Sequence, residues 1–170
     1  MPTEISGSTG VNKIQDNTIV NADINSSAAI AGSKLVMPTG SVLQVVSASG
    51  GGVVNSSSNS FVDTGLSAAI TPSATSSKIL IIVDQNLASD AAGNWTGFGI
   101  FRGSTAIKET SYIQRPGGSH LHTQVAYNYL DSPNTTSATT YKTMFKASSG
   151  GAKTNDNSAP STITLMEIAG

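Results

Sequence analysis

The sequence lacks cysteine altogether, so it forms no disulfide bonds and offers no thiolate for catalysis or metal binding. Charged residues make up only 11% of the 170 residues, against roughly 25% in an average soluble domain. The net charge is −1 and no run of lysine or arginine occurs, which excludes the basic surface of a nucleic-acid-binding protein. No apolar run approaches the ~20 residues of a membrane-spanning helix, so we expect no membrane insertion.

Serine, threonine, asparagine and glycine take the place of charged residues, and many of the apolar residues are valine and isoleucine. Serine and asparagine side chains compete for backbone hydrogen bonds, which disfavours helices, while β-branched residues favour strands. The composition therefore predicts an all-β protein. The first residues, MPTEISGSTGVNK, show no secretory signal, although a weakly charged polar surface is typical of extracellular β proteins. A virion component, made in the host cytoplasm and released by lysis, satisfies both observations.

Residues 1–37 differ in pattern from the rest of the chain. Isolated apolar residues recur there at intervals of five or six, namely Ile14, Ile19, Ile24, Ile30 and Leu35. This spacing matches neither the 3.6-residue period of a helix nor the alternation of a strand. The segment is either a disordered tail or an extended arm whose apolar residues pack against copies of themselves or against a partner. In the second case this arm, as we call residues 1–37, would serve in attachment and oligomerisation.

Residues 38–170, which we call the head, contain strand-like runs separated by turn-forming residues. The expected strands lie within 41–48, 60–70, 77–87, 95–109, 119–131, 135–148 and 161–170, and the range 95–109 is a hairpin that turns at RGST. Gly65 is a candidate β-bulge, and the apolar run ILIIV (79–83) predicts a central strand buried on both faces. About eight strands at regular spacing predict a jelly-roll-like antiparallel β-sandwich.

Two parts of the chain resemble a known group of proteins. GSTGVNKIQDNTIVNADINSSAAIAGSKL (7–35) resembles the N-terminal segments of tail-fibre-like and other structural proteins of marine and freshwater bacteriophages. YLDSPNTTSATTYKTMFKASSGG (129–151) and STITLMEIAG (161–170) resemble the small β heads that end such proteins. The resemblance implies a homotrimer of β-sandwich heads carried on an intertwined arm. It implies no catalytic residues, and it does not extend to residues 48–118.

The only two histidines, His120 and His122, lie two residues apart on the expected strand 119–131. Side chains at this spacing on a strand share a face, but two imidazoles alone make a poor metal site. Three chains around a threefold axis would bring six imidazoles together, a set suited to a transition-metal ion. The phage fibres that this chain resembles carry such stacked His-x-His pairs on the trimer axis. The alternative is a pair of surface histidines on an edge strand.

Aromatic side chains are candidates for recognising a host glycan. Trp95, the only tryptophan, lies beside a loop, where it would stack on a sugar ring, and Tyr112 would serve in the same way. The alternative for Trp95 is an aromatic residue of the core or of an interface. Tyr127 and Tyr129 share a face with Val125, so we expect them to pack between sheets or between chains.

The residues that could support catalysis do not form a recognisable pattern. No serine lies in a nucleophile elbow, and both histidines belong to one strand without an evident acidic partner. No spacing singles out a pair of carboxylates among Asp63, Asp84, Asp90, Glu109, Asp131 and Glu167. Glu167 alternates with apolar neighbours and is expected to face solvent. We therefore expect no enzyme activity and no cofactor other than the metal ion discussed above.

Two functions remain, and both involve association rather than chemistry. The first is a trimeric fibre- or spike-like virion protein whose head contacts a protein or glycan of the host surface. The second is a capsid-decorating or cement protein whose arm binds the shell or another virion protein. A glycan-binding module is a more remote alternative. The same head and arm serve all three, so the sequence leaves the attachment site open.

Overall fold

The computed structural model describes residues 24, 27, 30, 35–50, 52–90, 92–114, 117, 121–148, 150–156 and 159–170, except for the side chains of residues 111, 112 and 114. The chain divides into two units, Met1–Val36 and Met37–Gly170. All the described strands belong to the second unit. Among the described residues, no helix is long and apolar enough to span a membrane.

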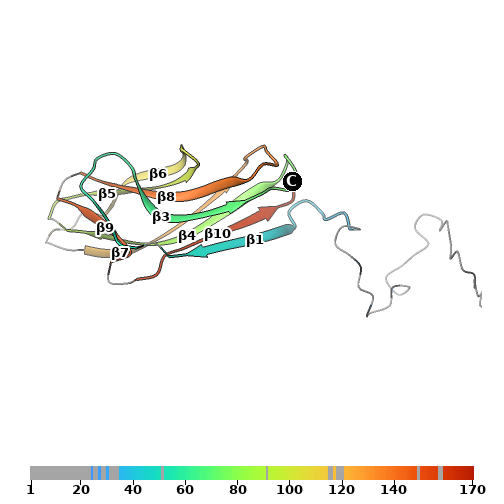
Figure 1. Ribbon diagram of the computed structural model, residues 1–170, viewed down its shortest axis with the longest axis horizontal. Coiled ribbons are helices and arrows are strands. Elements are labelled where there is room, and N and C mark those ends of the chain that lie inside the picture. The colour runs from blue at the N-terminus through green and yellow to red at the C-terminus, as the bar shows by residue number, and fades with distance from the viewer. Residues whose placement is uncertain are drawn as a thin grey trace, which may run out of the picture. The chain divides into compact units, whose positions relative to one another are not determined.

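The described part of the head contains ten strands arranged in two antiparallel sheets that form two layers (Figure 1). They are β1 (Val42–Ser49), β2 (Val54–Ser56), β3 (Val62–Ile70), β4 (Lys78–Ser89), β5 (Thr96–Arg102), β6 (Thr105–Gln114), β7 (Leu121–Asp131), β8 (Thr139–Ala147), β9 (Ala152–Thr154) and β10 (Thr162–Ile168). One sheet has the order β1-β10-β4-β9-β2, with β7 also paired to β4, and the other has the order β3-β8-β5-β6.

The order of the long strands is that of a jelly roll. When the three-residue strands β2 and β9 are set aside, one sheet reads β1-β10-β4-β7 and the other β3-β8-β5-β6. The chain therefore changes sheet at each connection between long strands except the β5–β6 hairpin. Two Greek keys folded over one another produce this alternation between sheets. The prediction of an all-β, jelly-roll-like antiparallel sandwich is confirmed.

The core lies between the two sheets and follows from the two-residue period of the strands. Alternate residues of β3, β4, β8 and β10 are buried, as in the pattern of β4, where Ile79, Ile81 and Val83 point inward. The largest buried side chains are Tyr141, Phe98, Phe145, Leu66, Ile79, Ile81, Leu87, Ile100, Ile163 and Leu165. This apolar burial is the main stabilising contribution to the fold.

The expectation for the two tyrosines of β7 is confirmed, and the alternative within it is resolved. Tyr127 and Tyr129 pack against the core, on the same side of β7 as buried Val125. Phe98 belongs to the opposite sheet, and its ring packs against the ring of Tyr127 in an edge-to-face arrangement, with the two centroids 5.5 Å apart. These tyrosines therefore pack between the sheets of the head.

The apolar run of β4 differs from its prediction in one respect. β4 is central, because β10 pairs with one edge and β7 with the other. It is not buried on both faces, since Leu80 is only partly buried and Ile82 is exposed on the outer side. The sequence of the run does not distinguish its two faces. The second sheet covers only one of them, so the outer face remains at the surface of the head.

The local turn predictions are confirmed, whereas two short strands were not predicted. Gly65 has a φ of 80°, and the register between β3 and β8 shifts between Asp63 and Ser67, as a bulge requires. Gly103, with a φ of 59°, turns the chain between β5 and β6 at RGST. β2 and β9, in the loops before β3 and β10, pair with one another, and their sequences carry no signal stronger than the surrounding loop.

Candidate interaction surfaces

His122 lies on the outer side of β7 and is exposed. Its Nδ1 is 3.9 Å from Oδ2 of Asp156, which is a long contact for an ion pair. His120 lies outside the described residues. Within the described part of the chain, no group of three histidine or acidic side chains is placed to hold a metal ion. The threefold-axis site of His120 and His122 stays a prediction.

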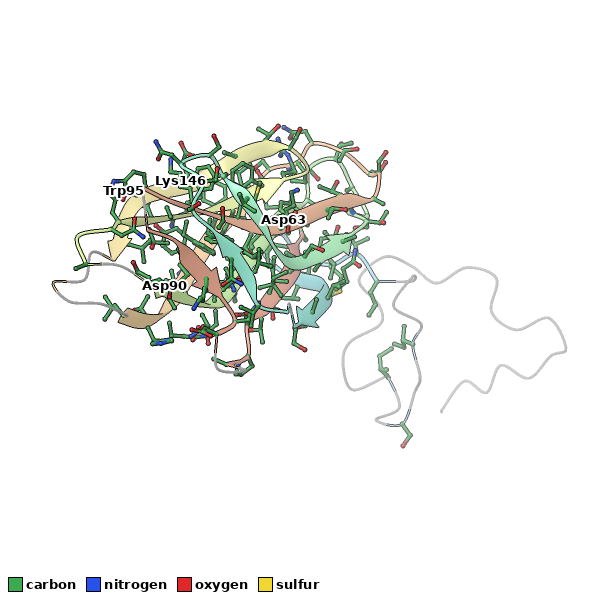
Figure 2. The ribbon with its side chains drawn as sticks, turned by 60° about the vertical axis from the view of Figure 1, so that its left-hand side comes forward. Asp63, Asp90, Trp95 and Lys146 are labelled. Carbon is green, nitrogen blue, oxygen red and sulfur yellow. The ribbon has the colours of Figure 1, made fainter. Side chains whose placement is uncertain are left out.

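Trp95 belongs to a cluster of aromatic rings around Lys146 on the outer side of β5 and β8. Figure 2 shows Trp95 and Lys146 beside one another, with Asp90 apart from them. The Lys146 ammonium lies 4.4 Å from the centroid of the Phe61 ring and 5.9 Å from that of Trp95. Such cation–π contacts hold the side chains in place. Glycan stacking on Trp95 stays a prediction, and the side chain of Tyr112 is outside the described residues.

The members of the regular apolar series of the arm that the structure describes are exposed. These are Ile24, Ile30 and Leu35, while Ile14 and Ile19 are outside the described residues. Exposed aliphatic side chains at a regular spacing lack the burial that would stabilise them within one chain. The attachment and oligomerisation role of the arm is still a prediction.

Glu167 is the most strongly held carboxylate of the described chain, and the expectation that it faces solvent was wrong. Its side chain is fully buried. Oε1 accepts hydrogen bonds from Ser73 N (2.7 Å), Ser73 Oγ (2.6 Å) and Ser77 Oγ (2.6 Å), and Oε2 accepts one from Gln44 Nε2 (2.6 Å). Burial alone would raise the pKa of Glu167, but these four donors outweigh it and lower the pKa to about 2. The ionised carboxylate ties β10 to β1 and to the loop before β4.

Asp131, at the end of β7, joins the two sheets. Its Oδ2 accepts a hydrogen bond from Arg102 Nη1 at 2.8 Å and another from Tyr141 Oη at 2.7 Å. Burial and the hydrogen bond to Asp131 raise the pKa of the Tyr141 hydroxyl. Tyr141 therefore remains a hydrogen-bond donor across the ordinary pH range. Both partners of Asp131 come from the β3-β8-β5-β6 sheet, so this cluster holds the sandwich together.

A chain of polar side chains crosses the core at Gln85. Thr143 Oγ1 donates to Gln85 Oε1 at 2.9 Å, and Gln85 Nε2 donates to Ser161 Oγ at 2.9 Å and Asn155 Oδ1 at 3.2 Å. The hydroxyl groups of Thr143 and Thr64 share a further hydrogen bond. A buried amide costs free energy unless such partners satisfy it. The network links β3, β8, β4 and the residue before β10, and its donors and acceptors bond to one another.

One cleft of the described head has a volume of about 390 Å³. It is lined by Ser49, Gly50, Gly52, Val53, Asn155, Ala159 and Pro160. These side chains include no ionisable group, so the cleft offers neither a general acid nor a general base.

The outer face of the β1-β10-β4-β7 sheet carries a row of apolar side chains that was not predicted. Antiparallel pairing aligns Val45 with Met166, Met166 with Leu80, and Leu80 with Leu130. Paired residues share a face, so these four side chains form a row across four strands. We call this surface the outer face. Alternation along each strand was the available signal, but it could not show which strands become neighbours.

Comparison with known proteins adds a distant likeness in fold. No family model matches the chain, and neither does a curated protein. Among solved structures, the crystal structure of the infectious bursal disease virus VP2 subviral particle has a TM-score of 0.44 and 13% identity, covering 74% of this chain and 37% of that chain. The structure of the infectious bursal disease virus Gt strain has a TM-score of 0.43 and 16% identity, covering 84% and 41%. This chain thus spans less than half the length of the chains that it matches.

Proposed function

We propose that the protein is a non-enzymatic structural component of a bacteriophage virion, a homotrimer with a fibre- or spike-like form. The arm joins the copies to one another and to other virion proteins, and the head contacts the host surface. The observation that carries this proposal is a weakly charged jelly-roll head preceded by a segment of regularly spaced apolar residues. Of these residues, Ile24, Ile30 and Leu35 are exposed.

The physical basis of the proposal is the burial that the arm requires. A segment whose apolar residues are isolated by polar ones cannot form its own core, and neighbouring copies would supply the missing surface. The head supports a binding role because buried Glu167 and Gln85 are engaged in hydrogen bonds that hold the fold together. Contacts of individually low affinity at the head would gain strength from several copies.

A capsid-decorating or cement protein is the second candidate. Fully extended, residues 1–37 would reach on the order of 100 Å at ~3.3 Å per residue, far enough to contact a neighbouring virion protein. In this case the arm would bind the shell and the head would project from it. The two candidates differ in the virion protein that the arm contacts.

The test uses the full chain and single substitutions in the arm. Ile24→Asp and Ile30→Asp place a charge at positions of the regular series, while Val36→Asp places the same charge at an exposed apolar residue outside it. We expect the wild type and Val36→Asp to have the mass of three copies by light scattering and to enter virus particles. The two series variants should lose both properties while keeping the circular dichroism of the head. A monomeric wild type would refute the homotrimer, and normal incorporation of both series variants would refute the role of the arm.

A further inference from the structure

The outer face has an apolar centre that spans the four long strands of the sheet. Beside the row Val45–Met166–Leu80–Leu130, the face also includes Ile168 and Ile82, each two residues along its strand from a member of the row, and Val42, which pairs with Ile168. Val45 is 55% exposed and Leu130 is 49% exposed, so these side chains are at the surface of the head. An apolar patch that spans several strands is often a functional surface.

Mostly polar residues border this centre on the side toward the middle of β4. The next row there contains Ser47, Thr164 and Asn128 beside Ile82, and the row after it contains Ser49, Thr162, Asp84 and Ala126. An apolar centre with a polar border is the usual composition of an interface between proteins. The four strands span roughly 15 Å across, and five outward positions span roughly 27 Å along a strand. The face therefore supplies on the order of half of the ~800 Å² that each partner buries in a standard interface.

The charges of the outer face favour a partner with the same surface. Its central strand carries one exposed lysine, Lys78, and one exposed aspartate, Asp84, on either side of Leu80 and Ile82. A second copy brings the same two opposite charges and no net charge, so it can approach without repulsion. A strongly charged partner, such as nucleic acid or an anionic lipid surface, would gain no electrostatic attraction here.

We propose that the outer face of the β1-β10-β4-β7 sheet is the surface through which the head contacts a second copy of this chain. The inference rests on the homo-oligomer of the proposed function, and it identifies the part of the head that the oligomer buries. Val45, Met166, Leu80 and Leu130 form the centre of the contact. His122 lies on the same outward side of β7, so association through this face would also bring histidines of different copies nearer to one another.

The chain contains no cysteine, which permits a direct test with a single introduced thiol. Val45→Cys and Leu130→Cys place the thiol on the outer face. Val53→Cys is the matched control, because Val53 is 51% exposed and lies in the loop before β2, outside the apolar row. The rate of alkylation by iodoacetamide is measured in each full-length variant and divided by the rate in urea. The mass of each variant is measured by light scattering at the same concentration.

The proposal is supported if the protein is an oligomer and the normalised alkylation rates of the Val45→Cys and Leu130→Cys thiols are at least ~10-fold lower than that of the Val53→Cys thiol. An oligomer in which all three thiols react equally overturns it, and leaves the proposed function intact with the copies joined elsewhere. A monomer with three equally reactive thiols refutes both the inference and the homotrimer. A monomer in which the thiols at 45 and 130 are protected also overturns the inference, because residues 1–36 of the same chain would then cover the face.

Discussion

Substitution of Glu167 by glutamine tests whether the buried carboxylate stabilises the fold by tying β10 to β1 and to the loop before β4. The side chain keeps its size but loses its charge. The carboxylate accepts three hydrogen bonds from Ser73 and Ser77 at one oxygen and one from Gln44 at the other. In Glu167→Gln the new amide group faces the amide of Gln44, which also donates to Thr71 O at 2.7 Å. Either orientation of the new amide therefore leaves a donor or an acceptor without a partner.

The magnitude follows from the pKa of Glu167, which the fold lowers from 4.5 to about 2. Since one pKa unit corresponds to 1.36 kcal/mol, the ionised group stabilises the fold by at most about 3 kcal/mol at pH 7. Part of the network is open to solvent at Ser73, so we expect Glu167→Gln to reduce the free energy of unfolding by about 2 kcal/mol. Because the folded-state pKa is depressed, this stabilisation is present above pH 4.5 and is lost as the pH falls through about 2. More than half of it should be lost at about pH 3.

The assay is urea unfolding of the wild type and Glu167→Gln at pH 7 and at pH 3. Glu109→Gln is the control, since Glu109 is exposed on β6 and its substitution should change the free energy of unfolding by less than about 0.5 kcal/mol. The difference between Glu167→Gln and wild type should be about 2 kcal/mol at pH 7 and less than about 1 kcal/mol at pH 3. An equal difference at both pH values would refute the role of the charge. Wild-type stability in the variant at pH 7 would refute the role of the whole network.

Three further predictions concern single residues, and in each the free energy of unfolding is measured in urea at pH 7. Tyr141→Phe removes a 2.7 Å hydrogen bond to buried Asp131 and should cost about 2 kcal/mol; a cost below about 0.5 kcal/mol would contradict the assigned contact. Gly65→Ala forces a side chain into a backbone with φ of 80° and should cost about 1 kcal/mol, whereas a stabilised variant would show that the bulge does not require glycine. Lys142→Met breaks the partly exposed ion pair with Asp63 and should change the free energy of unfolding by less than about 1 kcal/mol.

The sequence determined most of the strands and their turns because these depend on local chemistry. Alternating β-branched residues placed β1, β3, β4, β7, β8 and β10 to within a few residues. Gly65 and Gly103 marked a bulge and a turn because glycine adopts positive φ at little cost. The strands β2 and β9 escaped prediction because they are three residues long and are stabilised by pairing with one another rather than by their own composition.

The sequence by itself also determined the absence of thiol chemistry, the low charge and the regular spacing of apolar residues in the arm. Only the tertiary structure decided which face of each strand is buried. Glu167 and Ile82 are both flanked by apolar residues. Glu167 nevertheless points into the sandwich, where it accepts four hydrogen bonds, while Ile82 points outward. The row from Val45 to Leu130 joins residues 85 positions apart in the chain. Strand pairing that is distant in sequence creates such surfaces, and a local pattern of residues does not contain it.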